Sequence, residues 1–283
     1  MQIDVGAHKV RLKWHCLRKS RDDVPFTLER LVDGLKLGAS LEVDLRLHAD
    51  GGFVLLHDET LDRETTGSGR VADATLDVLR ALVMRAADGR PSRQRLILLE
   101  DIVKVVRLQG HPNALVQLDL KAKDAVLDEG VIEAFRDITA PFSGQFILGG
   151  DDWAAVTRLA AAVPALAVGF DPCPHGGLVL TDTRSALDFA EWALAASPGA
   201  RMLYLHYPLI LRAQELDVDL VAKIHAQGKQ VDAWTFNTDQ PDADAVLGRL
   251  IDLRVDQITT DEPMVIQERA EALLARSGAP RQY

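Results

Sequence analysis

The sequence has few cysteines and no long hydrophobic run, and each absence excludes a class of protein. Its 283 residues include only two cysteines, Cys16 and Cys173, too few for a disulfide scaffold, which favours the reducing cytoplasm. The N-terminus MQIDVGAHKVRLKW lacks the apolar core of a signal peptide. No run of about 18 apolar residues predicts a membrane span. We therefore expect a cytoplasmic protein without stable membrane insertion.

Basic residues are in the minority. The chain has 32 Lys and Arg against 42 Asp and Glu, a formal net charge of −10. This balance disfavours a general binder of nucleic acid or anionic membrane, because both partners are polyanions. It still allows a small anionic substrate in a locally basic pocket, and it gives no oligomeric state.

Strand-like apolar runs alternate with helical patterns along most of the chain. In TLERLVDGLKLG and LLEDIVKVVRLQG, apolar residues recur at i, i+3, i+4 and i+7, and DADAVLGRLIDL and MVIQERAEALLAR are later examples. Such alternation implies parallel sheet with right-handed crossovers. No glycine-rich dinucleotide-binding fingerprint follows the first strand, so about eight strand–helix units favour an α/β fold of the (β/α)₈ TIM-barrel type over an open sheet. We predict strands near residues 9–15, 41–47, 53–57, 115–121, 145–149, 165–171, 202–207, 230–236 and 256–260.

The domain organisation follows from the same alternation. We predict a single TIM-barrel domain over residues 1–276 and a flexible tail over 277–283, SGAPRQY. A stretch of turn-forming residues with a short helical pattern, approximately residues 60–95, fits the alternation poorly. We interpret it as a small insertion after the strand that His57 ends. It should lie over the C-terminal mouth of the barrel, where loops carry function.

Three predicted strands carry charged residues on one face. Side chains alternate across a strand, and in a barrel one face meets the helices while the other fills the interior. A single strand of this kind would be typical of a solvated antiparallel face, but three within a parallel pattern favour charged interior positions. The predicted inward sets are Arg11, Lys13 and His15; Glu42, Asp44 and Arg46; and Gln117, Asp119 and Lys121.

The clustered carboxylates predict a cation. Buried acidic groups that repel one another must either be protonated or bind a cation. The three oxygen donors Glu42, Asp44 and Asp119 suit one hard divalent ion, Mg²⁺ or Ca²⁺.

Two of the eight histidines stand out, because His15 and His57 both end strands beside the predicted metal. An imidazole with a pKa near 6.5 can give or take a proton at neutral pH. We interpret His8, His48, His111, His175 and His225 as structural or exposed. His206 should point inward with Tyr204, without further support.

The string LGASLEVDLRLHADGGFVLLHDETLDRETTGSGRV closely resembles the glycerophosphodiester phosphodiesterase family. There a Glu-x-Asp pair lies on the second strand, and a His-Asp precedes Leu-x-Arg-Thr-Thr and a Gly-x-Gly turn. LVQLDLK is similar to the family's Glu-Leu-Lys strand, and HAQGKQVDAWTFN and VDQITTDEP to its last two strands. The resemblance runs from about His15 to Pro263, and it is loose over residues 150–220.

The resemblance implies a role for each matching residue. His15 and His57 would form the acid–base pair, and Lys121 would neutralise phosphate charge. Trp234 would line the substrate pocket. The metal ligands would be Glu42, Asp44 and Asp119. The implied fold is a barrel with a small insertion after the second histidine.

Three positions depart from the family pattern. The family's His-Arg-Gly, whose arginine grips phosphate, is HCL here, with Cys16 and Leu17. Its Glu-Asn-Thr is PFT, so that only Thr27 remains, and the third-strand glutamate is Asp119. Cations that could replace the arginine are Arg11, Arg18, Lys19 and Arg21. Among these we predict Arg18 as a substrate-binding residue. Cys16 could be a nucleophile, but no Cys-His pair is recognisable near it, which favours small filler.

The resemblance predicts a metal-dependent phosphoric diester hydrolase with a small-molecule phosphodiester substrate, hydrolysed to an alcohol and a phosphomonoester. Two alternatives stay open. The substrate's own hydroxyl could attack and form a cyclic phosphate, which is lyase chemistry. The lost arginine could instead mark an inactive barrel that binds a phosphorylated ligand.

Overall fold

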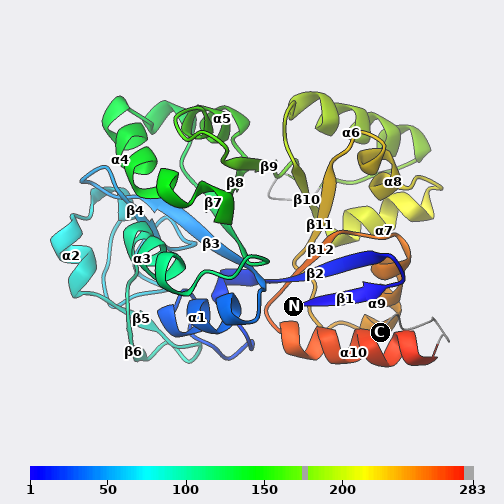
Figure 1. Ribbon diagram of the computed structural model, residues 1–283, viewed down its shortest axis with the longest axis horizontal. Helices are drawn as coiled ribbons and strands as arrows, with labels where there is room; N and C mark the ends of the chain where they lie inside the picture. Colours follow the sequence, from blue (N-terminus) through cyan, green and yellow to red (C-terminus); the bar gives the residue numbers. More distant parts are fainter. Residues whose placement is uncertain (174–177, 277–283) are drawn as a thin grey trace. The chain divides into compact units, whose positions relative to one another are not determined.

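The computed structural model describes residues 1–173 and 178–276 (Figure 1). The predicted tail 277–283 and His175 lie outside the described residues. The described residues group into two compact units, a larger unit of residues 14–168 and a smaller unit of residues 1–13, 169–173 and 178–276. The prediction that 1–276 form a single domain stays a prediction.

The larger unit contains most of the predicted site. Its strands are β3 (Ser40–Leu47), β4 (Phe53–Leu55), β5 (Val83–Arg85), β6 (Pro91–Arg95), β7 (Leu115–Leu120) and β8 (Phe146–Gly150), with β9 (Ala167–Phe170) at its end. Its helices are η1 (His15–Leu17), α1 (Leu28–Lys36), η2 (Val71–Asp73), α2 (Leu76–Ala81), α3 (Leu99–Gln109), η3 (Asp124–Val126), α4 (Glu129–Thr139), η4 (Ala140–Gln145) and α5 (Trp153–Ala161).

The strands β3, β7 and β8 are parallel neighbours, and α1, α3, α4 and α5 pack in succession along them (Figure 1). The apolar set of β3 is buried, with Leu41, Val43 and Leu45 fully inaccessible. Helix α1 approaches β3 closely at Gly34, where a Cβ atom would lie 2.4 Å from Leu41 Cδ2. The alternation read from the sequence therefore separates a helix-facing apolar side of β3 from a polar side.

The strand before His57 differs from the prediction. We expected His57 to end a strand over 53–57, but β4 ends at Leu55 and pairs antiparallel with β3, with Leu45 opposite Leu55. The prediction was wrong because an apolar run such as GGFVLL has the same pattern in parallel and antiparallel pairing. His57 instead follows a hairpin that turns back along β3.

The segment between β4 and α3 forms its own small sheet. Strands β5 and β6 pair antiparallel with each other and are separate from the main sheet. The short helix α2 precedes them. This is the stretch that we predicted as an insertion over residues 60–95, and its placement over the barrel mouth remains a prediction.

The smaller unit contains β1 (Gln2–Val5), β2 (His8–Trp14), β10 (Met202–His206), β11 (Gln230–Trp234) and β12 (Gln257–Thr260). Its helices are α6 (Thr183–Ala196), α7 (Tyr207–Glu215), α8 (Leu220–His225), α9 (Ala243–Asp252) and α10 (Pro263–Arg276). Strand β1, which the sequence did not predict, forms a hairpin with β2. No helix in the described part of the chain is long and apolar enough to span a membrane.

The strand order confirms the predicted fold. Strands β2, β12, β11, β10, β9, β8, β7 and β3 follow one another in hydrogen-bonded order, and β2 also pairs with β3. Eight strands connected in this way, with helices between them, form a (β/α)₈ barrel.

Candidate active site

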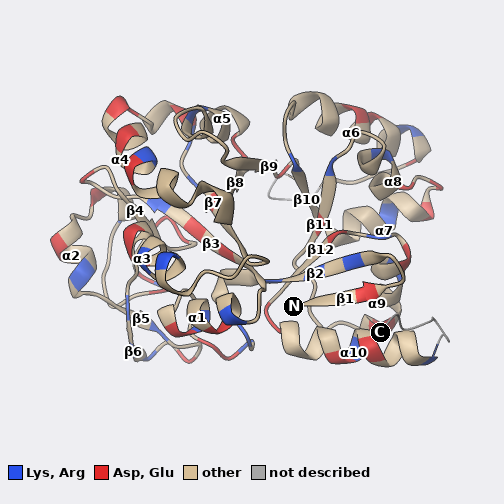
Figure 2. Ribbon diagram, in the orientation of Figure 1, with Lys and Arg blue, Asp and Glu red and all other residues tan. Residues whose placement is uncertain are grey.

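Three carboxylates meet on the polar side of β3 and β7. The strands are parallel and in register, with Asp44 opposite Asp119 and Glu42 opposite Gln117. Because side chains alternate along a strand, Glu42, Asp44 and Asp119 project to the same side. One carboxylate oxygen from each lies within 4.8 Å of the others, and Glu42 and Asp44 are buried. Figure 2 shows the acidic positions along β3 and the basic position at its end.

Lys121 holds two of these carboxylates. Its ammonium nitrogen lies 2.9 Å from Asp44 Oδ1 and 2.5 Å from Asp119 Oδ2. Burial opposes the lysine charge, but Asp119 and Asp44 outweigh it and raise the pKa of Lys121. Burial likewise works against the Asp44 charge, yet Lys121, with His57 and His15, lowers the pKa of Asp44. Lys121 therefore favours the ionised form of Asp44 and also pairs with Asp119.

Among the described residues, no lysine or arginine forms an ion pair with Glu42 as Lys121 does with Asp44 and Asp119. Burial and the nearby Asp44 charge raise the pKa of Glu42 to about 7. Three carboxylates with one ammonium leave a buried excess of negative charge, which is costly unless a further cation is bound. The donor set of three carboxylate oxygens is the type that Mg²⁺ and Ca²⁺ prefer. The residues present therefore fit a hard divalent ion.

His15 follows β2 in the short helix η1, beside Glu42. The backbone there is unusual, because Cys16 has a φ of 50° and Leu17 a φ of 60°, in the left-handed region that costs energy for residues other than glycine. The Cys16 N–H donates to Glu42 Oε2 at 2.7 Å. The turn thus brings His15 and Cys16 beside Glu42 of β3, with one potential ligand atom from each within 4.8 Å of the others.

His57 is oriented by residues that the sequence did not single out. Its Nδ1 lies 3.1 Å from Asp58 Oδ1, and its carbonyl accepts from the Arg46 guanidinium. Arg63 donates to both Asp58 oxygens, at 2.5 and 2.6 Å. The Arg63 hydrogen bonds outweigh the opposing effect of burial and lower the pKa of Asp58 to about 2. The signal was in the sequence, since Asp58 and Arg63 both stand in the quoted HDETLDR.

Arg18, Lys19, Arg21 and Thr27 lie in the turn after η1 and at the start of α1. Arg18 is half-buried directly after η1, and Arg21 is exposed. The Lys19 N–H donates to Asp23, which is also held by Arg30. Thr27, the residue left from the family's Glu-Asn-Thr, caps α1 by accepting from the Arg30 N–H at 3.2 Å. A structural role thus accounts for Thr27.

Trp234 lies in the smaller unit, at the end of β11. The centroid of its ring lies 4.9 Å from that of the His206 ring, and the two rings are tilted by 41°. His206 ends the neighbouring strand β10. The indole Nε1 is buried and has no hydrogen-bond partner among the described residues. An indole N–H of this kind normally finds an acceptor, so it suits a group supplied by a ligand.

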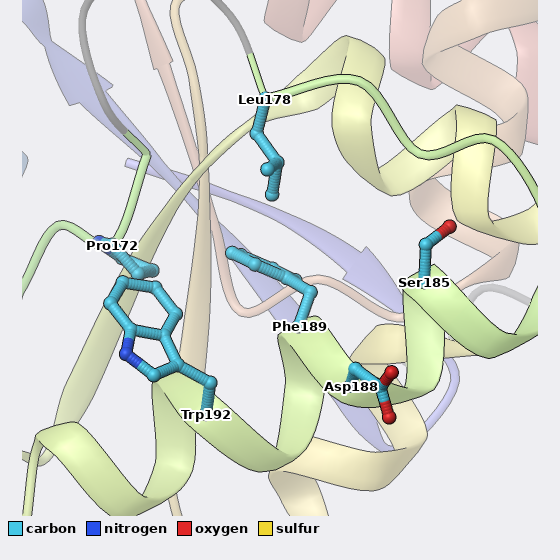
Figure 3. Close-up of a pocket in the computed structure, with 6 residues that line it drawn as sticks. All are labelled: Pro172, Leu178, Ser185, Asp188, Phe189 and Trp192. Carbon is cyan, nitrogen blue, oxygen red and sulfur yellow. The ribbon is translucent and has the colours of Figure 1, made fainter.

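A separate apolar hollow of about 450 Å³ lies beside α6 in the smaller unit (Figure 3). Figure 3 shows the Phe189 and Trp192 rings and the Leu178 side chain facing it, with Asp188 and Ser185 at its edge. Its lining has no histidine or lysine, unlike the carboxylate cluster of β3 and β7 with Lys121. We therefore place the chemistry at the carboxylate cluster.

Comparison with known proteins identifies the family. Residues 25–265 match the Glycerophosphoryl diester phosphodiesterase family. The chain belongs to this family. The Glycerophosphodiester phosphodiesterase of Caldanaerobacter subterraneus subsp. tengcongensis is 25% identical over 242 residues, which cover 84% of this chain and 88% of that protein. The predicted membership is confirmed, and with it the class of enzyme, a phosphoric diester hydrolase.

Solved structures of similar proteins show the same fold. A glycerophosphoryl diester phosphodiesterase from Parabacteroides distasonis has a TM-score of 0.67 at 18% identity, covering 99% of this chain and 91% of that one. An Oleispira antarctica phosphodiesterase, in complex with its product sn-glycerol-3-phosphate, has a TM-score of 0.65 at 19% identity and covers 92% of this chain and 96% of that one. At these identities the likeness concerns the fold, and it supports the (β/α)₈ barrel.

Proposed function

We propose that this chain hydrolyses a glycerophosphodiester-like substrate to an alcohol and a phosphomonoester, with a divalent cation and with His15 and His57 as acid and base. One observation carries the proposal: His15 lies with Glu42 at a group of three carboxylates, Glu42, Asp44 and Asp119, and His15 and His57 both contribute to the lowered pKa of Asp44 in that group. A base, an acid and a cation-binding cluster at one place are what in-line displacement at phosphate requires.

Glu42, Asp44 and Asp119 would hold the ion. When bound, such an ion supplies Lewis-acid polarisation of the phosphoryl oxygens. Lys121 keeps Asp44 and Asp119 in place through two of its three N–H donors. The third donor remains for a phosphoryl oxygen, which supports the predicted role of Lys121 in neutralising phosphate charge.

The contacts of His57 assign its reactive atom. Ionised Asp58 is only an acceptor, so the proton of the His57 ring must lie on Nδ1. His57 Nε2 is then the atom that gives or takes a proton during the reaction. His15 is the second proton carrier in this proposal, and the order of acid and base between the two stays open.

Trp234 and Arg18 complete the proposed substrate-binding set. The indole N–H of Trp234 is buried and has no acceptor in the described part of the chain, which supports hydrogen bonding to a substrate oxygen. Arg18 is the cation that follows the altered His-Cys-Leu turn, and we propose that it takes over part of the task of the missing arginine.

The test is turnover of glycerophosphodiesters with Mg²⁺ or Ca²⁺, followed by phosphorus NMR of the products. Release of a phosphomonoester that stops in excess EDTA is the expected result. A cyclic phosphate as the end product would instead assign the lyase reaction. Binding of glycerol phosphate without turnover of any diester would assign an inactive ligand-binding barrel, and would overturn the proposal.

A further inference from the structure

The turn after β2 places a thiol where the hard-metal chemistry does not need one. Cys16 Sγ lies 3.5 Å from His15 Nε2 and 3.6 Å from Asp44 Oδ2. The thiol is buried, and its neighbours are an imidazole nitrogen and carboxylate oxygens. Sulfur, nitrogen and oxygen donors at one point are the ligands of a borderline metal ion rather than of Mg²⁺ or Ca²⁺.

The separations match a tetrahedral zinc site. Zinc binds thiolate sulfur at about 2.3 Å, and imidazole nitrogen and carboxylate oxygen at about 2.0–2.2 Å. Tetrahedral angles then place the sulfur about 3.5–3.6 Å from each neighbouring nitrogen or oxygen ligand. The Cys16 sulfur has this spacing to His15 and to Asp44. A Glu42 oxygen lies within 4.8 Å of the potential ligand atoms of His15 and Cys16, and Glu42 is also grouped with Asp44.

The surrounding contacts leave these donor atoms suitably placed. Lys121 holds Asp44 through Oδ1, whereas Oδ2 is the atom that faces Cys16. The Cys16 N–H holds Glu42 through Oε2, so that the carboxylate is oriented by the same turn that carries the thiol. Such outer contacts fix ligand direction and strengthen metal binding.

We propose that His15, Cys16, Glu42 and Asp44 form a zinc-type site with the Cys16 thiolate as a ligand, and that its occupation inhibits the enzyme. Ligation replaces the S–H bond with a sulfur–metal bond and releases the proton to solvent. It also engages the lone pair of His15 Nε2, so His15 can no longer carry a proton. This inhibitory consequence rests on the proposed function, whereas the ligation itself does not.

The chain offers a matched control, because its only two cysteines are Cys16 and Cys173, both are buried, and neither forms a disulfide. Co²⁺, which replaces Zn²⁺ and absorbs light, is titrated into metal-free wild type, Cys16→Ser and Cys173→Ser with a thiol-free reductant. We expect a near-ultraviolet thiolate-to-cobalt band in wild type and Cys173→Ser, and none in Cys16→Ser. A band that is missing from the wild type, or that persists in Cys16→Ser, overturns the proposal.

A second measurement does not depend on the folding of a Cys16 variant. Zinc X-ray absorption of Cys173→Ser loaded with one equivalent of Zn²⁺ should show one sulfur scatterer at about 2.3 Å. A shell of nitrogen and oxygen alone would mean that the Cys16 thiol only donates a weak hydrogen bond to Asp44.

The regulatory part is tested by Zn²⁺ inhibition of Mg²⁺-supported glycerophosphodiester turnover. Wild type and Cys173→Ser should be inhibited alike. Cys16→Ser should need at least about tenfold more Zn²⁺, since loss of a direct ligand costs no less than loss of an outer contact. Equal inhibition of all three proteins overturns the inhibitory role. If no diester is turned over, the proposed function fails, while the cobalt band and the sulfur scatterer still decide the ligation.

Discussion

His57 depends on two residues that follow it in the chain. Asp58 accepts a hydrogen bond from the His57 imidazole, and the Arg63 guanidinium donates to both carboxylate oxygens of Asp58. None of these contacts follows a helix or strand period, because they join residues within one irregular loop. Sequence reasoning could therefore find His57 and quote the motif that contains Asp58 and Arg63, but the contacts by which these two residues orient His57 could be recognised only from the structure.

Replacing Asp58 with Asn should reduce kcat by up to about 10⁴-fold, since an amide no longer fixes the tautomer of a catalytic histidine. The neighbouring exposed Glu59→Gln is the control and should retain kcat, because the Glu59 carboxylate is exposed and pairs with the exposed Arg70. Steady-state kinetics at saturating metal measure the effect. Asp58→Asn with the same kcat as the control would remove Asp58 from the mechanism.

Asp58 should also contribute to stability in a pH-dependent way. Arg63 first, together with His57, lowers the pKa of Asp58 to about 2, below the value of about 3.9 for an unfolded chain. A lowered pKa stabilises the fold above the unfolded value, and the contribution is lost as the pH falls through the folded value. At pH 7 the free energy of unfolding of the wild type should exceed that of Asp58→Asn by about 1–2 kcal/mol. This difference should disappear as the pH falls from about 4 to 2. Urea unfolding across this range checks it, and a constant difference would contradict it.

The two proposed proton carriers should be the most sensitive histidines. His15→Ala and His57→Ala should each lower kcat by about 10²–10⁴-fold with folding retained, the usual contribution of a positioned acid or base. His111→Ala is the matched control, because His111 lies beyond α3 and accepts from the Asn113 N–H, outside the carboxylate cluster. Circular dichroism verifies folding. Near-normal kcat in both single variants would reject the assignment.

At the scale of elements, the sequence predicted those with a clear period. The predicted strands over 41–47 and 115–121 correspond to β3 (Ser40–Leu47) and β7 (Leu115–Leu120), because their apolar and polar residues alternate. Strand β1 was missed, since QIDV is too short to show a period. The antiparallel direction of β4 was also missed, because direction depends on the partner strand and leaves no mark in a short apolar run.

The packing of α1 on β3 gives a prediction at this scale. Gly34→Ala would place a Cβ atom 2.4 Å from the fully buried Leu41, so we expect it to destabilise the protein by about 1–3 kcal/mol. Gly248→Ala in α9 is the control, with nothing within 4 Å of the added atom. It should stabilise by about 0.5–1 kcal/mol through helix propensity. Thermal unfolding of both variants tests this, and equal shifts would contradict close packing at Gly34.

At the scale of the whole molecule, part of the excess negative charge is concentrated in the carboxylate cluster. The chain carries a formal charge of −10, and three of its carboxylates lie together on β3 and β7 with one lysine between two of them. The sequence predicted this cluster from strand alternation, and the structure brings the three oxygens within 4.8 Å. The three carboxylates thus repel one another at the place where the protein is proposed to bind a cation.

A bound divalent ion should therefore stabilise the whole fold. A ligand that binds only the folded state adds about 2.7 kcal/mol at a concentration of one hundred times its Kd. We expect Mg²⁺ or Ca²⁺ to raise the Tm of metal-free protein and EDTA to reverse the rise. Asp119→Asn should lose most of this response, because it removes a charged ligand and one partner of Lys121.

The control is Asp137→Asn on α4, whose carboxylate is exposed and pairs with Arg136. It removes the same charge from the net total, so it should keep the metal response of the wild type. If both variants respond alike, the metal effect comes from general screening of the acidic surface and not from the cluster. If only Asp119→Asn loses the response, then the cation acts at β3 and β7. Metal binding and stability would in that case depend on the same three carboxylates.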